Sequence, residues 1–406
     1  MVSGLLDGPP SPAFKGGVLA VSSFLILLLT ACTVGPPAQV DRLALPSAPA
    51  PVPMGEEPMD MAGIASGTTT PTPGLNGSRP GSTLPPPTYT PMIPPTPGPT
   101  DTPRSKPTTG VNSPTASPEP YAGLLIADLI RRDYGGGALD IVDTLEVTDS
   151  FTRYLITYPS DGLTIYGFMN VPNEGSRFPV VIALHGYIEA AAYKTLDYTK
   201  RYADELAEAG YFVIHPNLRG FPPSDEGDSA YRVGLAVDVL NLIAIVREQS
   251  QDPTGYLRRA DADDINLWGH SMGGGVVLRV ITVDNSPYIR AAVLYGAMSG
   301  DERRNYEKIL QWSDGEVGEF ELAAPLALLK AISPIYHLDR INAPLAVHHG
   351  LADDVVPPEW SADLCQRLEG LQQPVECHTY PAMPHTFHGA NDQLFMERVV
   401  DFYDRH

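Results

Sequence analysis

A serine in the middle of the chain has the neighbours of a catalytic nucleophile. Residues 265–277 read INLWGHSMGGGVV, an apolar run followed by a glycine-flanked serine and then a segment that predicts a helix. A strand, a sharp turn and a helix form a nucleophile elbow, which exposes the serine hydroxyl at the carboxyl end of the strand. Gly269 and Gly273 let the neighbouring chain pass close to the turn. We therefore expect Ser271 to attack an acyl carbon.

Two later segments supply a carboxylate and a histidine. Residues 345–357 read LAVHHGLADDVVP, which places Asp353 just past an apolar run, with Asp354 as the competing acid. Residues 380–388 read YPAMPHTFH, which offers His385 as general base and His388 as a lesser candidate. Catalytic groups of open α/β sheets collect at the carboxyl ends of the strands. The chain order Ser, Asp, His is that of α/β-hydrolases, in which the base takes the serine proton and the acid orients the imidazole.

The oxyanion hole of such a site needs two backbone N–H donors. One follows the nucleophile, at Met272, and we expect the second at Tyr187, because residues 181–187 read VIALHGY and place a glycine-containing loop after an earlier strand. His185 precedes the serine and ends that strand, so we interpret it as a structural or oxyanion-loop histidine. His348 and His349 lie at a strand end and are interpreted as packed side chains and not as metal ligands. His385 and His388 have no acidic or cysteine partner at ligand spacing, so zinc is not expected there.

The elements that must position these residues alternate along the chain. A leading antiparallel hairpin is expected at 151–158 and 163–170. Six short apolar runs read as strands buried on both faces: 179–184, 211–215, 265–268, 291–295, 345–348 and 375–380. Helices are expected near 121–132, 193–209, 231–249, 272–283, 359–370 and 392–403. This pattern predicts an α/β-hydrolase fold, a mostly parallel, doubly wound, eight-stranded sheet with helices on both faces.

The segment 301–330, rich in charge and then in Ala and Leu, falls where this fold accepts lid helices. A small helical lid and simple surface helices are the two interpretations. Arg219 is expected to fix the loop after its strand by placing its planar side chain on a carbonyl or carboxylate.

Residues 150–406 resemble the catalytic domain of the prolyl oligopeptidase family and its dienelactone-hydrolase-like neighbours. The matching stretches are 185–187, 209–220, the elbow, 333–335, 343–344, 350–357 and His385. The resemblance implies a triad of Ser271, Asp353 and His385, with Tyr187 and Met272 as backbone oxyanion donors. Family peptidases usually carry an N-terminal β-propeller, and here a proline-rich segment stands in its place. Some members complete the oxyanion hole with a tyrosine hydroxyl, at a position that holds His185 here.

The first 120 residues differ from the rest of the chain. An apolar run from Val18 to Leu29 follows Lys15 and ends in Leu-Thr-Ala-Cys, which resembles the lipobox of bacterial lipoproteins with Cys32 as the acylated residue. The run is shorter than the ~20 residues of a membrane span. An ordinary cleaved signal and a short anchor are the alternatives. Residues 33–120 hold 23 of the 42 prolines and predict a disordered tether.

Charge and cysteine usage limit the partners. The formal net charge is −21, and residues 121–406 hold 22 Lys+Arg against 41 Asp+Glu. This acidity argues against nucleic acid. We expect no metal and no cofactor, a small peptide or ester substrate, and a membrane contact through the lipid alone. If Cys32 is lipidated in an exported protein, Cys365 and Cys377 remain to form a disulfide, with two buried thiols as the alternative.

Three functions from different classes fit these features. The first is a bacterial, lipid-anchored, extracytoplasmic serine hydrolase that cleaves peptide or ester bonds, as a peptidase, a carboxylesterase or a dienelactone-hydrolase-like esterase. The second is an inactive binding module on the same fold, which the complete Ser, Asp and His set disfavours. The third is an acyltransferase, which would use an acceptor other than water.

Overall fold

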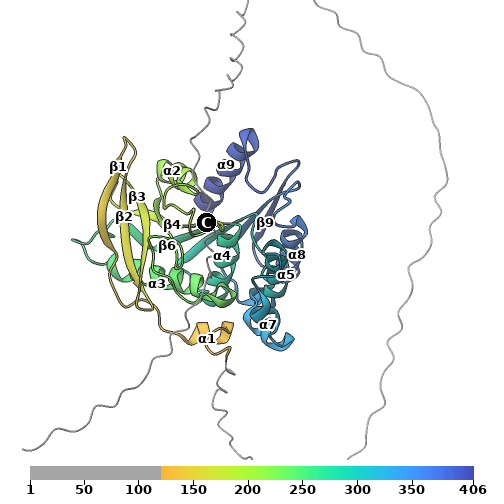
Figure 1. The fold of residues 1–406 in the computed structure, drawn as a ribbon. Helices are drawn as coiled ribbons and strands as arrows, with labels where there is room; N and C mark the ends of the chain where they lie inside the picture. The colour runs from red at the N-terminus through yellow and green to blue at the C-terminus, as the bar shows by residue number, and fades with distance from the viewer. Residues whose placement is uncertain (1–119) are drawn as a thin grey trace, which may run out of the picture. The chain divides into compact units, whose positions relative to one another are not determined.

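A nine-stranded sheet runs through residues 120–406, the part of the chain that the computed structural model describes (Figure 1). The strand order is β1-β2-β3-β5-β4-β6-β7-β8-β9. The first three pairs in this order, β1 with β2, β2 with β3 and β3 with β5, are antiparallel, and all the other pairs are parallel. The strands are β1 (Asp140–Val147), β2 (Phe151–Ser160), β3 (Leu163–Pro172), β4 (Phe178–Leu184), β5 (Phe212–Pro216), β6 (Ala260–His270), β7 (Ile289–Tyr295), β8 (Leu345–Gly350) and β9 (Val375–Tyr380). The predicted fold class is confirmed.

The expected count of eight strands is wrong, because β1 adds a ninth at the sheet edge. Its sequence, DIVDTLEV, is half polar, and nearly all of its side chains, apolar ones included, are exposed. Two irregularities interrupt its pairing with β2. An edge strand with acidic side chains and bulges lacks the buried apolar face on which sequence patterns depend.

Helices cover both faces of the sheet (Figure 1). Side chains of α2 and α9 pack with one face in one apolar cluster, and those of α1, α3, α4 and α8 pack with the other face in a second. The α-helices are α1 (Ile126–Arg131), α2 (Lys200–Glu208), α3 (Val233–Gln249), α4 (Met272–Val283), α5 (Glu302–Trp312), α6 (Glu319–Leu322), α7 (Leu326–Ile332), α8 (Pro358–Gly370) and α9 (Gly389–Arg405). Three short 3-10 turns are η1 (Ala230–Arg232), η2 (Pro334–Tyr336) and η3 (Leu338–Arg340). No helix of residues 120–406 has both the length and the apolar character to cross a bilayer.

The helix α2 begins seven residues later than the sequence suggested. Asn217, in the loop after β5, holds the residues before α2 in turns. Its amide oxygen accepts from the Tyr193 hydroxyl, and its amide nitrogen donates to the Thr195 hydroxyl. These long-range contacts override the local helical pattern.

The segment 301–330 forms α5, α6 and most of α7. Glu302 is buried and pairs with Arg232 at the start of α3 and with Arg279 in α4. Tyr231 donates to the Glu321 carbonyl. Within residues 120–406, no hydrogen bond, ion pair or ring contact links 301–330 to Ser271, Asp353 or His385. These bonds join the segment to η1 and α4, and the lid stays a prediction.

Candidate active site

The predicted nucleophile lies in the turn between β6 and α4. Ser271 has φ 54° and ψ −115°, outside the regions that most residues adopt, and it is 8% exposed. Its N–H donates to the Tyr295 carbonyl at the end of β7, and its carbonyl accepts from the N–H groups of Gly275 and Met298. Backbone bonds on both sides of the serine hold this strained conformation.

The two glycines of the elbow stand where no side chain fits. A Cβ atom at Gly269 would lie 2.4 Å from the Gly273 carbonyl oxygen. A Cβ atom at Gly273 would lie 2.5 Å from the carbonyl oxygen of Leu184 and 2.7 Å from that of His185. The start of α4 therefore lies directly against the end of β4 and the loop that follows it. Met272 begins α4 and Tyr187 lies in that loop, so this approach brings together the two segments that carry the expected oxyanion donors.

The expected acid and base are in direct contact. The Nδ1 atom of His385, in the loop after β9, lies 2.7 Å from Oδ2 of Asp353, just past β8. A Cβ atom at Gly296, which follows β7, would lie within 3.5 Å of both groups. Asp353 therefore orients His385 from the carboxyl end of the next strand.

Four groups surround the Asp353 carboxylate. Oδ1 accepts from the N–H groups of Val355 and Val356, and His349 Nε2 lies 3.1 Å from Oδ2, which also contacts His385. Burial by itself would raise the pKa of this carboxyl, but the hydrogen bonds from His349, His385 and the Val356 N–H, together with the charge of His385, hold the pKa below its ordinary value. Asp353 is thus an anion in the working range of pH.

The competing candidates have other positions. Asp354 is exposed, and His388 is exposed at the N-cap of α9. Neither of them makes a hydrogen bond to the pair of Asp353 and His385 within the described residues. The loop geometry thus separates the competitors from the pair.

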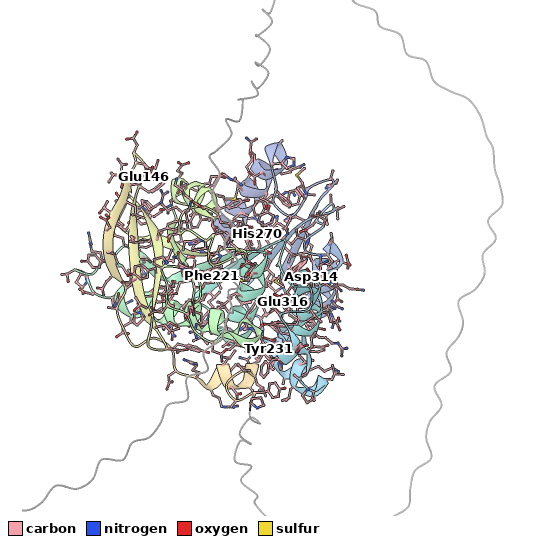
Figure 2. The ribbon with its side chains drawn as sticks, viewed as in Figure 1. Glu146, Phe221, Tyr231, His270, Asp314 and Glu316 are labelled. Atoms are coloured by element: carbon pink, nitrogen blue, oxygen red, sulfur yellow. A yellow bond between two sulfur atoms is a disulfide. The ribbon has the colours of Figure 1, made fainter. Side chains whose placement is uncertain are left out.

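Ser271 is linked to the pair of Asp353 and His385 through its neighbour in the chain, His270. His270 precedes the serine (labelled in Figure 2), and its Nε2 atom lies 3.0 Å from the His385 carbonyl oxygen, with the two rings 4.5 Å apart. Within residues 120–406 the Ser271 hydroxyl has no hydrogen-bond partner, so the contact with His385 is not made in this resting geometry. Catalytic hydrogen bonds often tighten only when substrate binds.

His270 has a role that the sequence did not single out. Its Nδ1 atom accepts a short hydrogen bond from the Tyr198 hydroxyl, and its Nε2 atom holds the His385 backbone. Burial first, and then the neighbouring His385, lower the pKa of His270 to about 3. A neutral ring that accepts at Nδ1 carries its proton at Nε2, where it donates to the His385 carbonyl.

The two expected oxyanion donors are available. Among residues 120–406, neither the N–H of Met272 nor that of Tyr187 is hydrogen-bonded to protein. Gly186 lies between the two loops, since a Cβ atom there would lie 3.2 Å from the Ser271 Cβ atom. The nucleophile and the donor loop therefore face each other.

His185 supports the donor loop from behind. It is fully buried, with Nδ1 2.7 Å from the Gly186 carbonyl oxygen and Nε2 2.7 Å from the Asn217 carbonyl oxygen. Burial lowers its pKa, while the contacts with these carbonyls oppose that change. It links the loops after β4 and β5, which fits the expected structural role. Arg219, in the loop after β5, donates to both oxygens of buried Asp238, as its planar side chain suggested.

Comparison with known proteins gives the family and the fold. The sequence profile of the prolyl oligopeptidase family matches residues 198–406. Esterase YjfP of Escherichia coli (strain K12) is 28% identical over 248 residues, which are 58% of this chain and 92% of that protein. The uncharacterized peptidase YtmA of Bacillus subtilis (strain 168) is 23% identical over 258 residues, 61% of this chain and 92% of that protein.

Solved structures share the architecture. Acetyl xylan esterase 1 from Thermoanaerobacterium sp. JW/SL YS485 superposes with a TM-score of 0.51 at 18% identity, over 66% of this chain and 89% of the esterase. The acylaminoacyl peptidase of Pyrococcus horikoshii gives a TM-score of 0.50 at 21% identity, over 63% of this chain and 42% of the peptidase. At these identities the likeness shows the fold.

Proposed function

The chain belongs to the prolyl oligopeptidase family and is a serine hydrolase of the peptidase or esterase type, and from that premise we propose that it cleaves its substrate through an acyl-enzyme on Ser271. The observation that carries this proposal is the 2.7 Å contact between His385 Nδ1 and Asp353 Oδ2. That contact leaves the other ring nitrogen of His385 free to serve the serine.

The proposed reaction has two halves. His385 takes the Ser271 hydroxyl proton as the oxygen attacks the acyl carbon, and it then returns the proton to the leaving alcohol or amine. In the second half His385 takes a proton from water, whose oxygen attacks the acyl carbon. The bond from the acyl carbon to the serine oxygen then breaks, and His385 returns the proton to that oxygen, which releases the acid and restores the Ser271 hydroxyl. Asp353 stabilises the imidazolium in both halves. The N–H groups of Met272 and Tyr187 stabilise the negative oxygen of each tetrahedral intermediate.

An ester is the substrate that we propose first, with a peptide or amide as the second candidate. Esterase YjfP shares 28% identity with this chain over 92% of its own length, against 23% for the uncharacterized peptidase YtmA, and this higher identity supports the ester. The uncharacterized peptidase YtmA is also matched over 92% of its own length, and its similarity supports a peptide or amide as the second candidate.

Labelling with a fluorophosphonate probe tests the nucleophile. Wild type should be labelled on Ser271, and Ser271→Ala should be neither labelled nor active. Labelling that persists in Ser271→Ala would contradict the proposal. Rates on p-nitrophenyl esters and on aminoacyl and prolyl p-nitroanilides, measured side by side, then decide between ester and amide. Transfer of the acyl group to an added alcohol in preference to water would indicate an acyltransferase.

We also propose that the enzyme works outside the cytoplasm of a bacterium, anchored by a lipid on Cys32. Cys32 and the tether lie outside the described residues. Support comes from the disulfide between Cys365 and Cys377, since disulfides persist in oxidising compartments. Metabolic labelling with a fatty-acid analogue should mark wild type and not Cys32→Ser, and label retained in that variant would contradict the anchor.

A further inference from the structure

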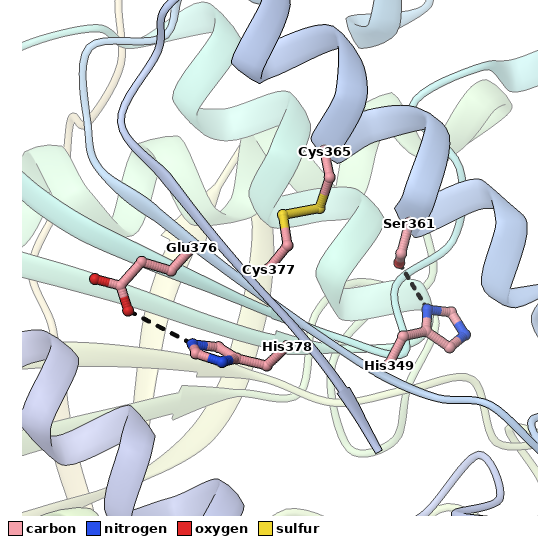
Figure 3. Close-up of a disulfide and its surroundings, with 6 residues drawn as sticks. All are labelled: His349, Ser361, Cys365, Glu376, Cys377 and His378. Atoms are coloured by element: carbon pink, nitrogen blue, oxygen red, sulfur yellow. Dashed lines mark hydrogen bonds and ion pairs between the residues drawn. A yellow bond between two sulfur atoms is a disulfide. The ribbon is translucent and has the colours of Figure 1, made fainter. Parts of the chain in front are cut away.

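His349, which the sequence presents as a packed residue, lies directly behind the proposed catalytic acid. It occupies β8 four residues before Asp353 and is 2% exposed. Its Nδ1 atom lies 2.6 Å from the Ser361 hydroxyl oxygen on α8 (Figure 3). Its Nε2 atom lies 3.0 Å from the Val356 carbonyl oxygen and 3.1 Å from Asp353 Oδ2.

These contacts assign the proton on the His349 ring. Both neighbours of Nε2 are oxygen atoms that only accept, so Nε2 carries the hydrogen. In the neutral ring Nδ1 then accepts from the Ser361 hydroxyl, which has no other partner in the described part of the chain. Ser361 thereby satisfies the accepting nitrogen of the tautomer that points its N–H toward the acid.

His349 holds the acid in two ways. Its Nε2 atom is hydrogen-bonded to the Val356 carbonyl and lies 3.1 Å from Asp353 Oδ2, and the Val356 N–H itself donates to Asp353 Oδ1. One imidazole therefore fixes the carboxylate and the turn that carries it. The neighbouring His348 differs, although it is equally buried: its Nδ1 atom pairs with the Tyr380 hydroxyl, and its ring stacks on His378.

We propose that His349, hydrogen-bonded to Ser361 at its other ring nitrogen, is a positioning residue that orients Asp353 toward His385. The inference rests on the proposed catalytic role of Asp353. A purely structural histidine would contribute to folding alone. A positioning residue also sets how strongly Asp353 attracts the proton on His385, because each donor to a carboxylate withdraws part of its charge.

The pH dependence of kcat/KM separates the two roles. The groups that face His385 are Asp353 from the loop after β8 and His270 from β6, and Tyr198 is bonded to His270. Without the N–H of His349, the carboxylate holds the imidazolium more tightly, so the acid limb of the profile moves to higher pH. No such movement follows from a loss of packing.

The experiment compares His349→Phe with His348→Phe in the full chain. Hydrolysis of p-nitrophenyl butyrate is followed at the isosbestic wavelength of p-nitrophenol from pH 5 to 9. We expect His349→Phe to lower kcat/KM roughly 10- to 100-fold, the order of loss that a misplaced catalytic group causes, and to move the acid limb upward. His348→Phe should lose stability and keep the wild-type limb. His349→Gln, whose amide can donate to Asp353, should recover most of the activity.

Two results would overturn the inference. One is wild-type kcat/KM in His349→Phe, and the other is an equal loss in both phenylalanine variants with an unmoved acid limb. If His349→Phe does not fold, Ser361→Ala is measured in its place. We expect its kcat/KM to fall roughly 3- to 10-fold and the acid limb of its pH profile to move to higher pH. A wild-type pH profile for Ser361→Ala would then overturn the inference. Asp353→Asn is measured in parallel, because activity retained there would refute the proposed function itself.

Discussion

Replacing Gly273 by alanine should separate the oxyanion donors without removing any side chain of the triad. The added Cβ atom would lie 2.5 Å from the carbonyl oxygen of Leu184, which ends β4, and 2.7 Å from that of His185, which begins the donor loop. A Cβ atom does not come that close to a backbone oxygen in real structures, so the loop and the start of α4 must move apart. The N–H groups of Met272 and Tyr187 move apart with them.

The expected magnitudes differ for folding and for catalysis. Forcing an extra methyl group into a packed site costs about 1–3 kcal/mol, and the gain of about 1 kcal/mol for alanine over glycine in a helix offsets part of it. The free energy of unfolding should therefore fall by no more than about 2 kcal/mol. Loss of one aligned oxyanion donor lowers kcat by about 10²- to 10³-fold. Activity should consequently fall far more than stability.

Gly275→Ala is the matched control, because it makes the same change one half-turn further along α4. There the nearest atom is the Met298 Cβ atom at 3.3 Å, which needs only a small adjustment. Initial rates on a p-nitrophenyl ester and affinity for a boronic acid, which mimics the tetrahedral intermediate, are measured for both variants. A kcat for Gly273→Ala within threefold of wild type, or an equal loss in the control, would refute the reasoning.

Three further outcomes are expected. His385→Ala should lower kcat by several orders of magnitude with little loss of stability, whereas His388→Ala should remain active, and the reverse would show that the base is misassigned. Buried His270 has a pKa of about 3, against ~6.5 in the unfolded chain, so below pH 6.5 the unfolded chain takes up a proton that the folded protein does not. The free energy of unfolding should therefore fall by up to about 1.4 kcal/mol per pH unit as the pH drops from about 6.5 toward 3. Equal urea midpoints at pH 7 and pH 5 would argue against this effect. Joint replacement of Cys365 and Cys377 by alanine, which opens a loop with a sequence separation of 12, should cost about 3 kcal/mol, read as a lower urea midpoint, and identical midpoints would contradict a stabilising bridge.

The sequence specified the parts of the fold whose signal is local. Parallel strands such as β8, buried along its whole length, leave an apolar run, and the elbow leaves its glycines. The edge strand β1 leaves neither, because most of its side chains face solvent. The start of α2 was predicted wrongly for another reason, because it depends on hydrogen bonds from Asn217, which lies in a separate loop.

The site residues also divide into those with a local sequence signal and those without one. Ser271, Asp353 and His385 follow strands whose ends the sequence marks, so their chain order predicted a shared edge. His349 and His270 could not be assigned, because their roles depend on which face of a strand meets α8 or the His385 loop. The pairing of Cys365 with Cys377 was open for the same reason, and the structure joins their sulfur atoms between α8 and β9 (Figure 3).

The order of the site residues along the chain has a consequence for synthesis. A nascent chain that has emerged through β7 already contains the elbow and the donor loop, but its acid follows β8 and its base follows β9. The base loop is also held by contacts with α9 and its neighbours, since Phe387 packs on Phe395. An unfinished chain on the ribosome therefore has a serine without a base. The synthesising cell is exposed to the hydrolytic activity only after the C-terminal strand and helix have been added.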